Sequence, residues 1–356
     1  MRFLDFRQGG RARLGALVGV LSLVAVACET GDAQDVLSPA GEFARSPDRL
    51  WDLTFGIAVA VFILVEGILV FTLFRYRSRP DRKASQFHGN TKVEILLTAI
   101  PALILAGIAV PTVSTIFDLA EPREGALQIK VIGHQFWWEY QYLDEGFVTA
   151  NELHIPTNTP VELTVEGGLI DRVTGDAQVI HSFWAPRLAG KQDLIPGHAN
   201  QLFIEADDPG IYFGQCTEFC GLGHAEMRLR VYAESGSDFE QWVSDQKSAP
   251  EAPSGGSLAE RGQKLFAEGQ FREGLNCAAC HAVEATPEDV APNQGPNLAH
   301  FASRDTFASA IFKNTEENLK AWIADPASVK PGARMPALGL TESEIDAVVA
   351  YLKTLE

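Results

Sequence analysis

The chain has 356 residues, enough for two or three domains. Its 46 acidic and 29 basic residues give a formal net charge of −17, which argues against nucleic-acid binding and favours a basic protein partner. The five cysteines form one singleton, Cys28, and two close pairs at 216/220 and 277/280, a spacing that indicates cofactor sites rather than a disulfide framework.

The first 27 residues are typical of an export signal, because several arginines precede an apolar run that ends before Cys28. The sequence Ala25-Val26-Ala27-Cys28 resembles a bacterial lipobox, although such motifs usually have leucine three residues before the cysteine. We expect a signal peptide over 1–27 and an extracytoplasmic segment over 28–49. Lipidation of Cys28, ordinary signal cleavage and an uncleaved first helix remain as alternatives.

Two apolar stretches, at about 53–74 and 95–117, are each long enough to cross a bilayer of about 30 Å. The short loop between them is rich in arginine and lysine, whereas the flank before residue 50 is acidic, so the positive-inside rule puts the loop in the cytoplasm. We therefore predict a transmembrane hairpin over 50–120 and an extracytoplasmic location for all that follows.

Beyond the hairpin the pattern changes to short β-type runs separated by turn-forming residues, at 127–131, 136–142, 161–165, 201–204 and 227–232. Residues 121–247 are therefore predicted to form a small Greek-key sandwich or barrel. Residues 248–257, rich in Pro, Ser, Ala and Gly, indicate a flexible linker. The last part, 258–356, is predicted to be helical, with helices at 258–270, 307–311, 315–324 and 341–355.

The loop 214–227 carries two thiols, one imidazole and one thioether, on Cys216, Cys220, His224 and Met227. These soft and borderline ligands favour copper over hard cations, and two thiolates so close can bridge a pair of metal ions. His181, at the end of an apolar strand, is the best candidate for a second imidazole. A structural zinc site and a disulfide between the two cysteines are the alternatives, and the nearby Met227 argues against both.

The second cysteine pair lies in Cys277-Ala278-Ala279-Cys280-His281, the attachment sequence of a c-type haem. Two thiols add to the haem vinyl groups and the adjacent histidine coordinates iron. Met335 is the natural second axial ligand, with His300 as the alternative, and methionine opposite histidine raises the reduction potential of an electron carrier. A zinc site is disfavoured because no second ligand pair follows.

With these motifs, residues 50–235 resemble subunit II of the haem-copper cytochrome c oxidases, and residues 258–356 resemble class I cytochrome c. The resemblance implies a multidomain membrane protein with a two-helix transmembrane hairpin, a Greek-key β cupredoxin domain and an all-α class I cytochrome c domain. It implies a binuclear copper A centre bridged by Cys216 and Cys220, with His181, His224, Met227 and the Glu218 backbone carbonyl as the other ligands. It also implies that the Glu218 side chain binds a magnesium ion shared with subunit I.

Two more positions follow from the resemblance. Glu94, in Lys92-Val93-Glu94-Ile95, resembles the family's glutamate at the entrance of a proton channel, with a plain interfacial carboxylate as the alternative. The segment 133–140 resembles the aromatic strand where a tryptophan receives electrons from cytochrome c. Its first aromatic residue is Phe136 instead of tryptophan, so Phe136 and Trp137 are both candidates, with core packing as the alternative.

Together the modules resemble subunit II of a caa3-type oxidase, in which a tethered cytochrome passes electrons to copper A. By that resemblance, electrons continue to subunit I, where oxygen is reduced to water and protons are pumped. The expected partners are subunit I, subunit III, membrane lipid and an electron donor such as a soluble cytochrome c or a cytochrome bc1-type complex. The expected location is the bacterial inner membrane, with both cofactor domains in the periplasm. A copper A nitric oxide reductase and a tethered electron-transfer module outside an oxidase are the rival functions.

Overall fold

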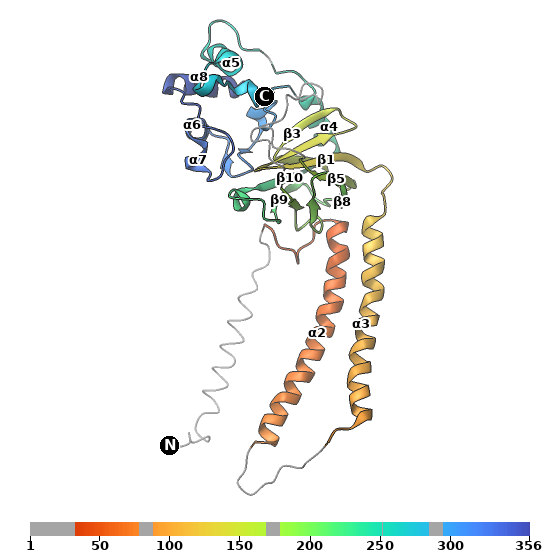
Figure 1. The fold of residues 1–356 in the computed structure, drawn as a ribbon. Helices are drawn as coiled ribbons and strands as arrows, with labels where there is room; N and C mark the ends of the chain where they lie inside the picture. Colours follow the sequence, from red (N-terminus) through yellow and green to blue (C-terminus); the bar gives the residue numbers. More distant parts are fainter. Residues whose placement is uncertain (1–32, 78–87, 169–178, 251, 285–294) are drawn as a thin grey trace, which may run out of the picture.

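The computed structural model describes residues 33–77, 88–168, 179–250, 252–284 and 295–356. Its elements form three successive parts: two long helices, a pair of β-sheets and a group of short helices (Figure 1). The expected signal peptide and Cys28 lie outside the described residues.

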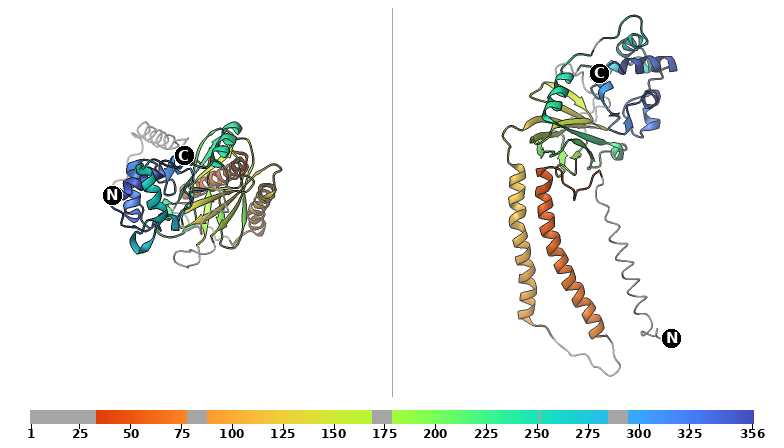
Figure 2. Two further views of the ribbon diagram at one scale, coloured as in Figure 1. Left: turned by 90° about the horizontal axis from the view of Figure 1, so that it is seen from above. Right: turned by 180° about the vertical axis from the view of Figure 1, so that it is seen from behind.

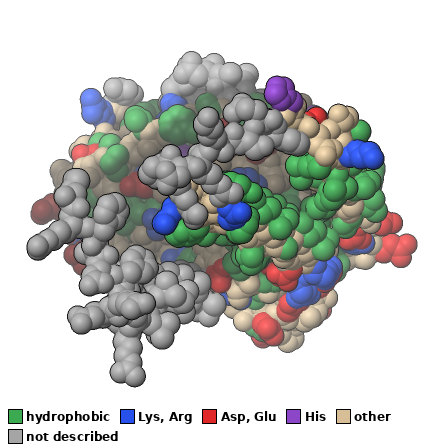
Figure 3. Space-filling model, turned by 90° about the horizontal axis from the view of Figure 1, so that it is seen from below, with side chains coloured by type: hydrophobic (Ala, Val, Ile, Leu, Met, Phe, Trp, Pro, Cys, Tyr) green, Lys and Arg blue, Asp and Glu red, His purple; other side chains and the backbone are tan. Residues whose placement is uncertain are grey.

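Two helices, α2 (Glu42–Arg75) and α3 (Thr91–Ala120), run side by side below the sheets (Figures 1 and 2). Both are long and apolar enough to cross a membrane. Their apolar side chains are exposed, with Phe62 and Leu103 at 64% and 72%, and hydrophobic side chains gather in a broad patch on the underside (Figure 3). Apolar surface of this extent calls for lipid or other membrane helices around it.

Helix α2 begins at Glu42 rather than near residue 53, because its first turns lie against the sheets. Phe43 is buried and stacks on Phe203, with ring centroids 5.6 Å apart. Arg45 forms an ion pair with Asp207. Hydropathy marks only the part of a helix that crosses lipid, so it did not indicate these anchoring turns.

Two five-stranded sheets form the middle part, and one apolar core lies between them. The first sheet has the order β3-β2-β1-β5-β8 and contains β1 (Leu127–His134), β2 (Trp137–Tyr142), β3 (Phe147–Ala150), β5 (Val161–Gly167) and β8 (Asn200–Ile204). The second has the order β4-β10-β9-β6-β7 and contains β4 (Glu152–Pro156), β6 (His181–Trp184), β7 (Gln192–Leu194), β9 (Gly210–Cys216) and β10 (Arg228–Glu234). This is the expected β-sandwich.

The sequence did not indicate β3, β4, β7, β9 or helix α4 (Gly236–Gln246). It placed His181 at the end of an apolar strand, whereas His181 is the first residue of β6. All four residues of β3 are buried, so its hydrophobicity does not alternate, and β7 has only three residues. Helix α4 begins at the side-chain cap of Ser235, which accepts a hydrogen bond from the Asp238 amide.

The last part contains helices α5 (Leu258–Glu268), α6 (Glu316–Ala324), α7 (Pro326–Val329) and α8 (Glu342–Leu352). The predicted capping box between Thr341 and Glu344 opens α8. Three short 3₁₀ turns, η2 (Arg272–Gly274), η3 (Cys277–Ala279) and η5 (Phe301–Ser303), connect the helices, and a further 3₁₀ turn, η1 (His224–Glu226), belongs to the sandwich. The helical part lies beside the sandwich on the side remote from α2 and α3 (Figures 1 and 2).

The helix predicted at 307–311 is wrong. Strand β11 (Thr306–Phe307) pairs instead with β12 (Phe312–Lys313), and each strand has only two residues. Ala308, Ser309 and Ala310 between them have positive φ angles of 52°, 65° and 57°. The Ser309 hydroxyl donates a hydrogen bond to the Phe136 carbonyl of the sandwich, a tertiary contact that local propensity cannot anticipate.

We predict that Gly262→Ala destabilises the helical domain. A Cβ atom at this position would lie 1.9 Å from the Ala347 carbonyl oxygen, where α5 crosses α8. Overpacking of this kind costs about 1–3 kcal/mol. The midpoint of thermal unfolding, followed through haem absorbance, should fall. The control is Gly236→Ala, where the added Cβ has no atom within 4 Å, and equal unfolding midpoints for both variants would contradict the packing argument.

Candidate functional site

The six predicted copper ligands meet at one end of the second sheet. Strand β6 begins with His181 and pairs with β9, which ends at Cys216, in a register that sets Phe183 opposite Cys216. The chain then turns through η1 and returns as β10. A hydrogen bond of 2.8 Å from the Cys216 amide to the Met227 carbonyl closes the loop between β9 and β10.

The donor atoms face one another in this loop. The two cysteine sulfurs are 3.9 Å apart, well beyond the length of a disulfide bond. Each sulfur has an imidazole nitrogen nearby: His181 Nδ1 is 3.8 Å from Cys216 and His224 Nδ1 is 3.7 Å from Cys220. The Glu218 carbonyl lies 3.2 Å from Cys216 Sγ and the Met227 sulfur 3.9 Å from Cys220 Sγ. His181 and both cysteines are buried and close enough together to hold a metal ion.

The two thiols differ in acidity. A hydrogen bond with Cys220 lowers the pKa of Cys216, while the same contact, together with burial, raises the pKa of Cys220. A second negative charge so close to the first is costly in a buried place. A cation between the sulfurs would remove that cost, so this donor set fits metal bound by two thiolates.

Glycines allow close contacts around His181 and around the loop 214–227, which carries the other predicted copper ligands and is called the copper loop below. A Cβ on Gly133 would lie 2.9 Å from the His181 ring, so β1 can pass this histidine only without a side chain. A Cβ on Gly223 would lie 2.5 Å from the ring of Phe136. The Phe136 ring therefore packs directly on the backbone of the copper loop.

The helical domain contains a cavity of about 330 Å³ that has Cys277, Cys280, His281 and Met335 in its walls. The His281 ring donates a hydrogen bond from Nδ1 to the Pro296 carbonyl at 2.8 Å, which leaves Nε2 for a ligand. Because that acceptor is a carbonyl, Nδ1 carries the proton. Burial lowers the pKa of His281, which favours the neutral imidazole that binds iron.

A buried cation in the cavity wall is a further sign of the cavity's occupant. Burial lowers the pKa of Arg304, a residue of the cavity wall, to about 10. Its guanidinium donates to the Asn297 and Ala299 carbonyls at 2.8 and 2.9 Å. A buried guanidinium is best stabilised by an anion. Haem carries carboxylate groups as well as an apolar ring, so these walls fit haem.

Met335 lies in the cavity wall, whereas His300 does not. The His300 ring instead faces the chain end, with Nδ1 2.7 Å from the Glu356 carbonyl. The geometry thus favours Met335 over His300 as the second axial ligand.

The two aromatic candidates also form part of the cavity wall, although they belong to the sandwich. Phe136 and Trp137 are each 7% exposed. Trp137 stacks on His134 with ring centroids 4.2 Å apart. Phe136 therefore lies between the haem cavity on one side and the copper loop on the other.

Three family models match successive parts of the chain: "Cytochrome C oxidase subunit II, transmembrane domain" over 33–115, "Cytochrome C oxidase subunit II, periplasmic domain" over 127–234 and "Cytochrome c" over 259–356. Cytochrome c oxidase subunit 2 of Alkalihalophilus pseudofirmus is 34% identical over 94% of this chain and 95% of its own length. The chain belongs to the cytochrome c oxidase subunit 2 family. The protein of that name from Bacillus sp. (strain PS3) is 34% identical over 97% of each chain.

The solved periplasmic domain of subunit II of cytochrome oxidase from Bradyrhizobium japonicum is 32% identical and covers 35% of this chain and 94% of its own, with a TM-score of 0.31. The family match and these relatives show that the chain is a component of a terminal oxidase, an oxidoreductase complex. It combines the transmembrane and periplasmic domains of subunit II with a fused cytochrome c domain. The match to the periplasmic domain of subunit II implies copper A, and the match to cytochrome c implies haem.

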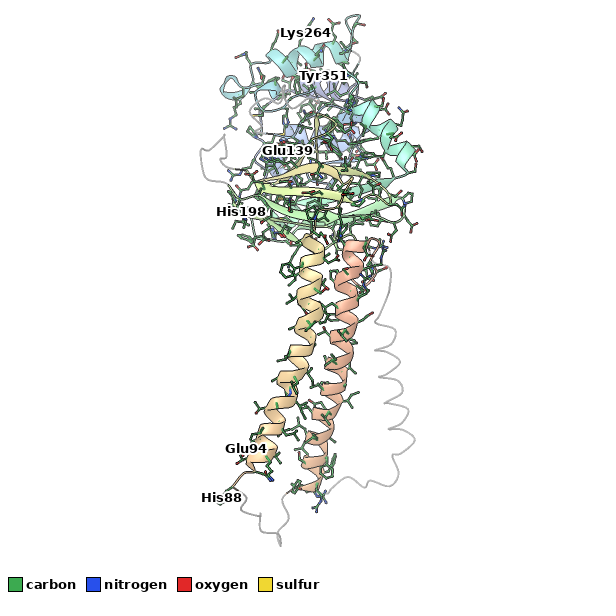
Figure 4. All side chains as sticks on the ribbon, turned by 90° about the vertical axis from the view of Figure 1, so that its right-hand side faces the viewer. His88, Glu94, Glu139, His198, Lys264 and Tyr351 are labelled. Carbon is green, nitrogen blue, oxygen red and sulfur yellow. The ribbon has the colours of Figure 1, made fainter. Side chains whose placement is uncertain are left out.

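The proton-channel and magnesium candidates are Glu94 and the Glu218 side chain. Glu94 is in the first turn of α3, at the end of the hairpin farthest from the sandwich (Figure 4). Asn90 caps this turn by accepting from the Lys92 and Val93 amides. The Glu218 side chain is exposed while its carbonyl faces Cys216.

Sequence reasoning missed the residues that join the two cofactor domains. They include Gln135, Glu152, Ser309 and Lys330, and each forms a hydrogen bond across the boundary between the sandwich and the helical domain. Lys330 is only 2% exposed. The sequence holds no signal for it, because a lysine before proline and glycine normally indicates a surface turn.

We predict that Cys220→Ser removes copper from this protein. Serine cannot supply the second soft thiolate, so copper affinity should fall by more than the roughly 10–100-fold typical of changes outside the ligand shell. Metal analysis and EPR of the purified complex measure this. Ser182→Ala is the control, because this buried hydroxyl next to His181 has no hydrogen-bond partner among the described residues. Unchanged copper content in the cysteine variant would contradict the assignment.

Proposed function

We propose that this chain accepts electrons on a covalently bound haem c and passes them through binuclear copper A to subunit I of a caa3-type oxidase. Oxygen is reduced to water there, and the reaction is coupled to proton pumping. Phe136 carries the proposal, since it forms part of the haem cavity wall and packs on Gly223 of the copper loop. A donor site and an acceptor site that share one side chain suit electron transfer between them.

We assign the haem to Cys277, Cys280, His281 and Met335. Copper A is assigned to two copper ions held by His181, Cys216, Glu218, Cys220, His224 and Met227. The copper loop supplies soft sulfur and imidazole donors. Bound copper A supplies one-electron redox chemistry. The chain's own contribution is to hold the donors in a buried, preformed arrangement, so that little reorganises when the charge changes.

The remaining assignments concern partners and location. We propose domain limits of 50–120, 121–247 and 258–356, with a linker at 248–257. Subunits I and III pack on the apolar helices, and Glu94 leads protons toward subunit I. The Glu218 side chain shares a magnesium ion with that subunit. The donor to haem c is a soluble cytochrome c or a bc1-type complex, and the protein resides in a bacterial inner membrane with both cofactor domains in the periplasm.

The test of this function is spectroscopy of the purified complex together with oxygen uptake. Visible spectra should show haem c, EPR should show a mixed-valence copper signal, and oxygen should be consumed with reduced cytochrome c as the donor. Haem c without the copper signal would contradict the copper assignment. Both signals with no oxygen uptake would favour a tethered electron-transfer module, and nitric oxide consumption would favour a nitric oxide reductase.

We predict that Met335→His lowers the haem reduction potential and slows oxygen uptake at the step where an external donor reduces the haem. Each fall of about 59 mV shifts that one-electron equilibrium about tenfold toward oxidised haem. Redox titration and oxygen uptake measure the two effects, and the copper EPR signal should be unchanged. His300→Asn is the control, and a fall in potential in that variant instead would identify His300 as the axial ligand.

A further inference from the structure

Buried hydrogen bonds join the cytochrome domain to the sandwich. Lys330 Nζ is buried and donates to two carbonyls: that of Phe136 in the sandwich at 3.2 Å and that of Ala308 in its own domain at 2.9 Å. Ser309 Oγ donates to the same Phe136 carbonyl at 2.9 Å. One backbone oxygen thus accepts two hydrogen bonds from the other domain.

A second buried contact lies beside the first. Glu152 is 3% exposed, and its carboxylate accepts from the Thr306 amide at 2.8 Å and the Thr306 hydroxyl at 2.5 Å. The Asp305 amide lies 3.3 Å from the other oxygen of the same carboxylate. A buried carboxylate without hydrogen-bond donors is costly in free energy. The donors from Thr306 and Asp305 are lost when the domains separate, and water then has to replace them.

The third contact reaches the copper loop. Gly332, at φ 86°, approaches so closely that a Cβ there would lie 2.9 Å from the Gly223 amide nitrogen. Arg334, next to Met335, donates to the Gln135 side chain, and that side chain donates to the Cys220 carbonyl. The loop of the haem ligand therefore touches the loop of the copper ligands.

The haem cavity is completed by the sandwich. Gln135, Phe136, Trp137 and Asn151 form part of its wall, together with residues of the cytochrome domain. Burial of a cation costs free energy unless its hydrogen-bond partners are fixed in place. A buried lysine at the domain contact therefore suits a domain that stays docked, and does not suit one that moves on a flexible tether.

We propose that the cytochrome domain works from one fixed docked position, held by a latch in which Lys330 and Ser309 donate to the Phe136 carbonyl. This inference rests on the proposed function. One electron leaves the haem iron, which is oxidised from the ferrous to the ferric state, and one electron enters copper A, with no proton or ligand exchanged. Lys330 and Ser309 are positioning residues, and the linker over 248–257 takes no part in each transfer.

The experiment measures this transfer in the full oxidase complex. A light pulse excites a soluble ruthenium complex that reduces the haem, and copper absorbance then reports arrival of the electron. The linker is doubled in length with Gly-Ser residues, and the measurement is repeated at raised viscosity. A fixed domain should keep the same rate in all three conditions. For a swinging domain, doubling the linker should lower the effective concentration, and hence the rate, by about threefold, and viscosity should slow transfer further.

Variants of the latch make the second arm. Lys330→Glu sets an anion against two carbonyls, so the docked population should fall and transfer should slow by about tenfold or more, given the strength of hydrogen bonds to charged groups. Transfer should then also depend on linker length. Lys320→Glu is the matched control, because Lys320 makes an exposed ion pair with Asp346 of its own domain, and this variant should leave the rate unchanged. Ser309→Ala is the milder variant, with haem absorbance and copper EPR confirming that both domains are folded.

Linker dependence in the native complex, or equal rates for Lys330→Glu and Lys320→Glu, would overturn the latch while leaving the proposed function intact. The absence of any haem-to-copper transfer in the native complex would overturn both.

Discussion

The segment between β1 and β2 contacts both predicted redox sites, and the arrangement of the two cofactor domains depends on its position. The Phe136 ring lies over Gly223 in the copper loop, while its carbonyl accepts from Ser309 and Lys330 of the cytochrome domain. Asn151 holds the next residues in place by accepting from the Trp138 amide at 3.0 Å. A shift of this segment would therefore disturb the copper loop, the domain contact and the haem cavity together.

The copper loop shows a second constraint, which is electrostatic. Two buried thiols 3.9 Å apart cannot both ionise cheaply, and burial alone disfavours either thiolate. The protein brings them together nonetheless, using strand pairing at Cys216 and the return of the chain at Met227. The doubly ionised pair is favourable only when a cation compensates its charge, so ionisation of the thiols and metal binding are coupled at this site.

The sequence predicted the chemistry of this chain better than its geometry. The copper and haem motifs are dense in residues with few alternative roles, and the structure brings the predicted copper donors within 4 Å of a neighbouring donor. Strands such as β3 and β7 were missed because short or fully buried segments lose the alternation that identifies a strand. The helix predicted at 307–311 does not form, because Ser309 has a left-handed conformation and its hydroxyl binds the Phe136 carbonyl of the sandwich.

The contact between domains was beyond the reach of sequence reasoning for a related reason. Lysine, serine and glutamate are ordinarily surface residues, and their pattern in a single sequence does not tell which of them a second domain will cover. Here burial lowers the pKa of Lys330 to about 8, so the domain contact makes the charged lysine less favourable. The two carbonyls that accept its hydrogen bonds offset this cost only while the two domains stay in contact. A tether raises the chance that two domains meet, but it cannot set an orientation. The orientation has to come from directional hydrogen bonds at the contact itself. Those from Ser309 and Lys330 meet at the Phe136 carbonyl, in the residue that contacts both the haem cavity and the copper loop.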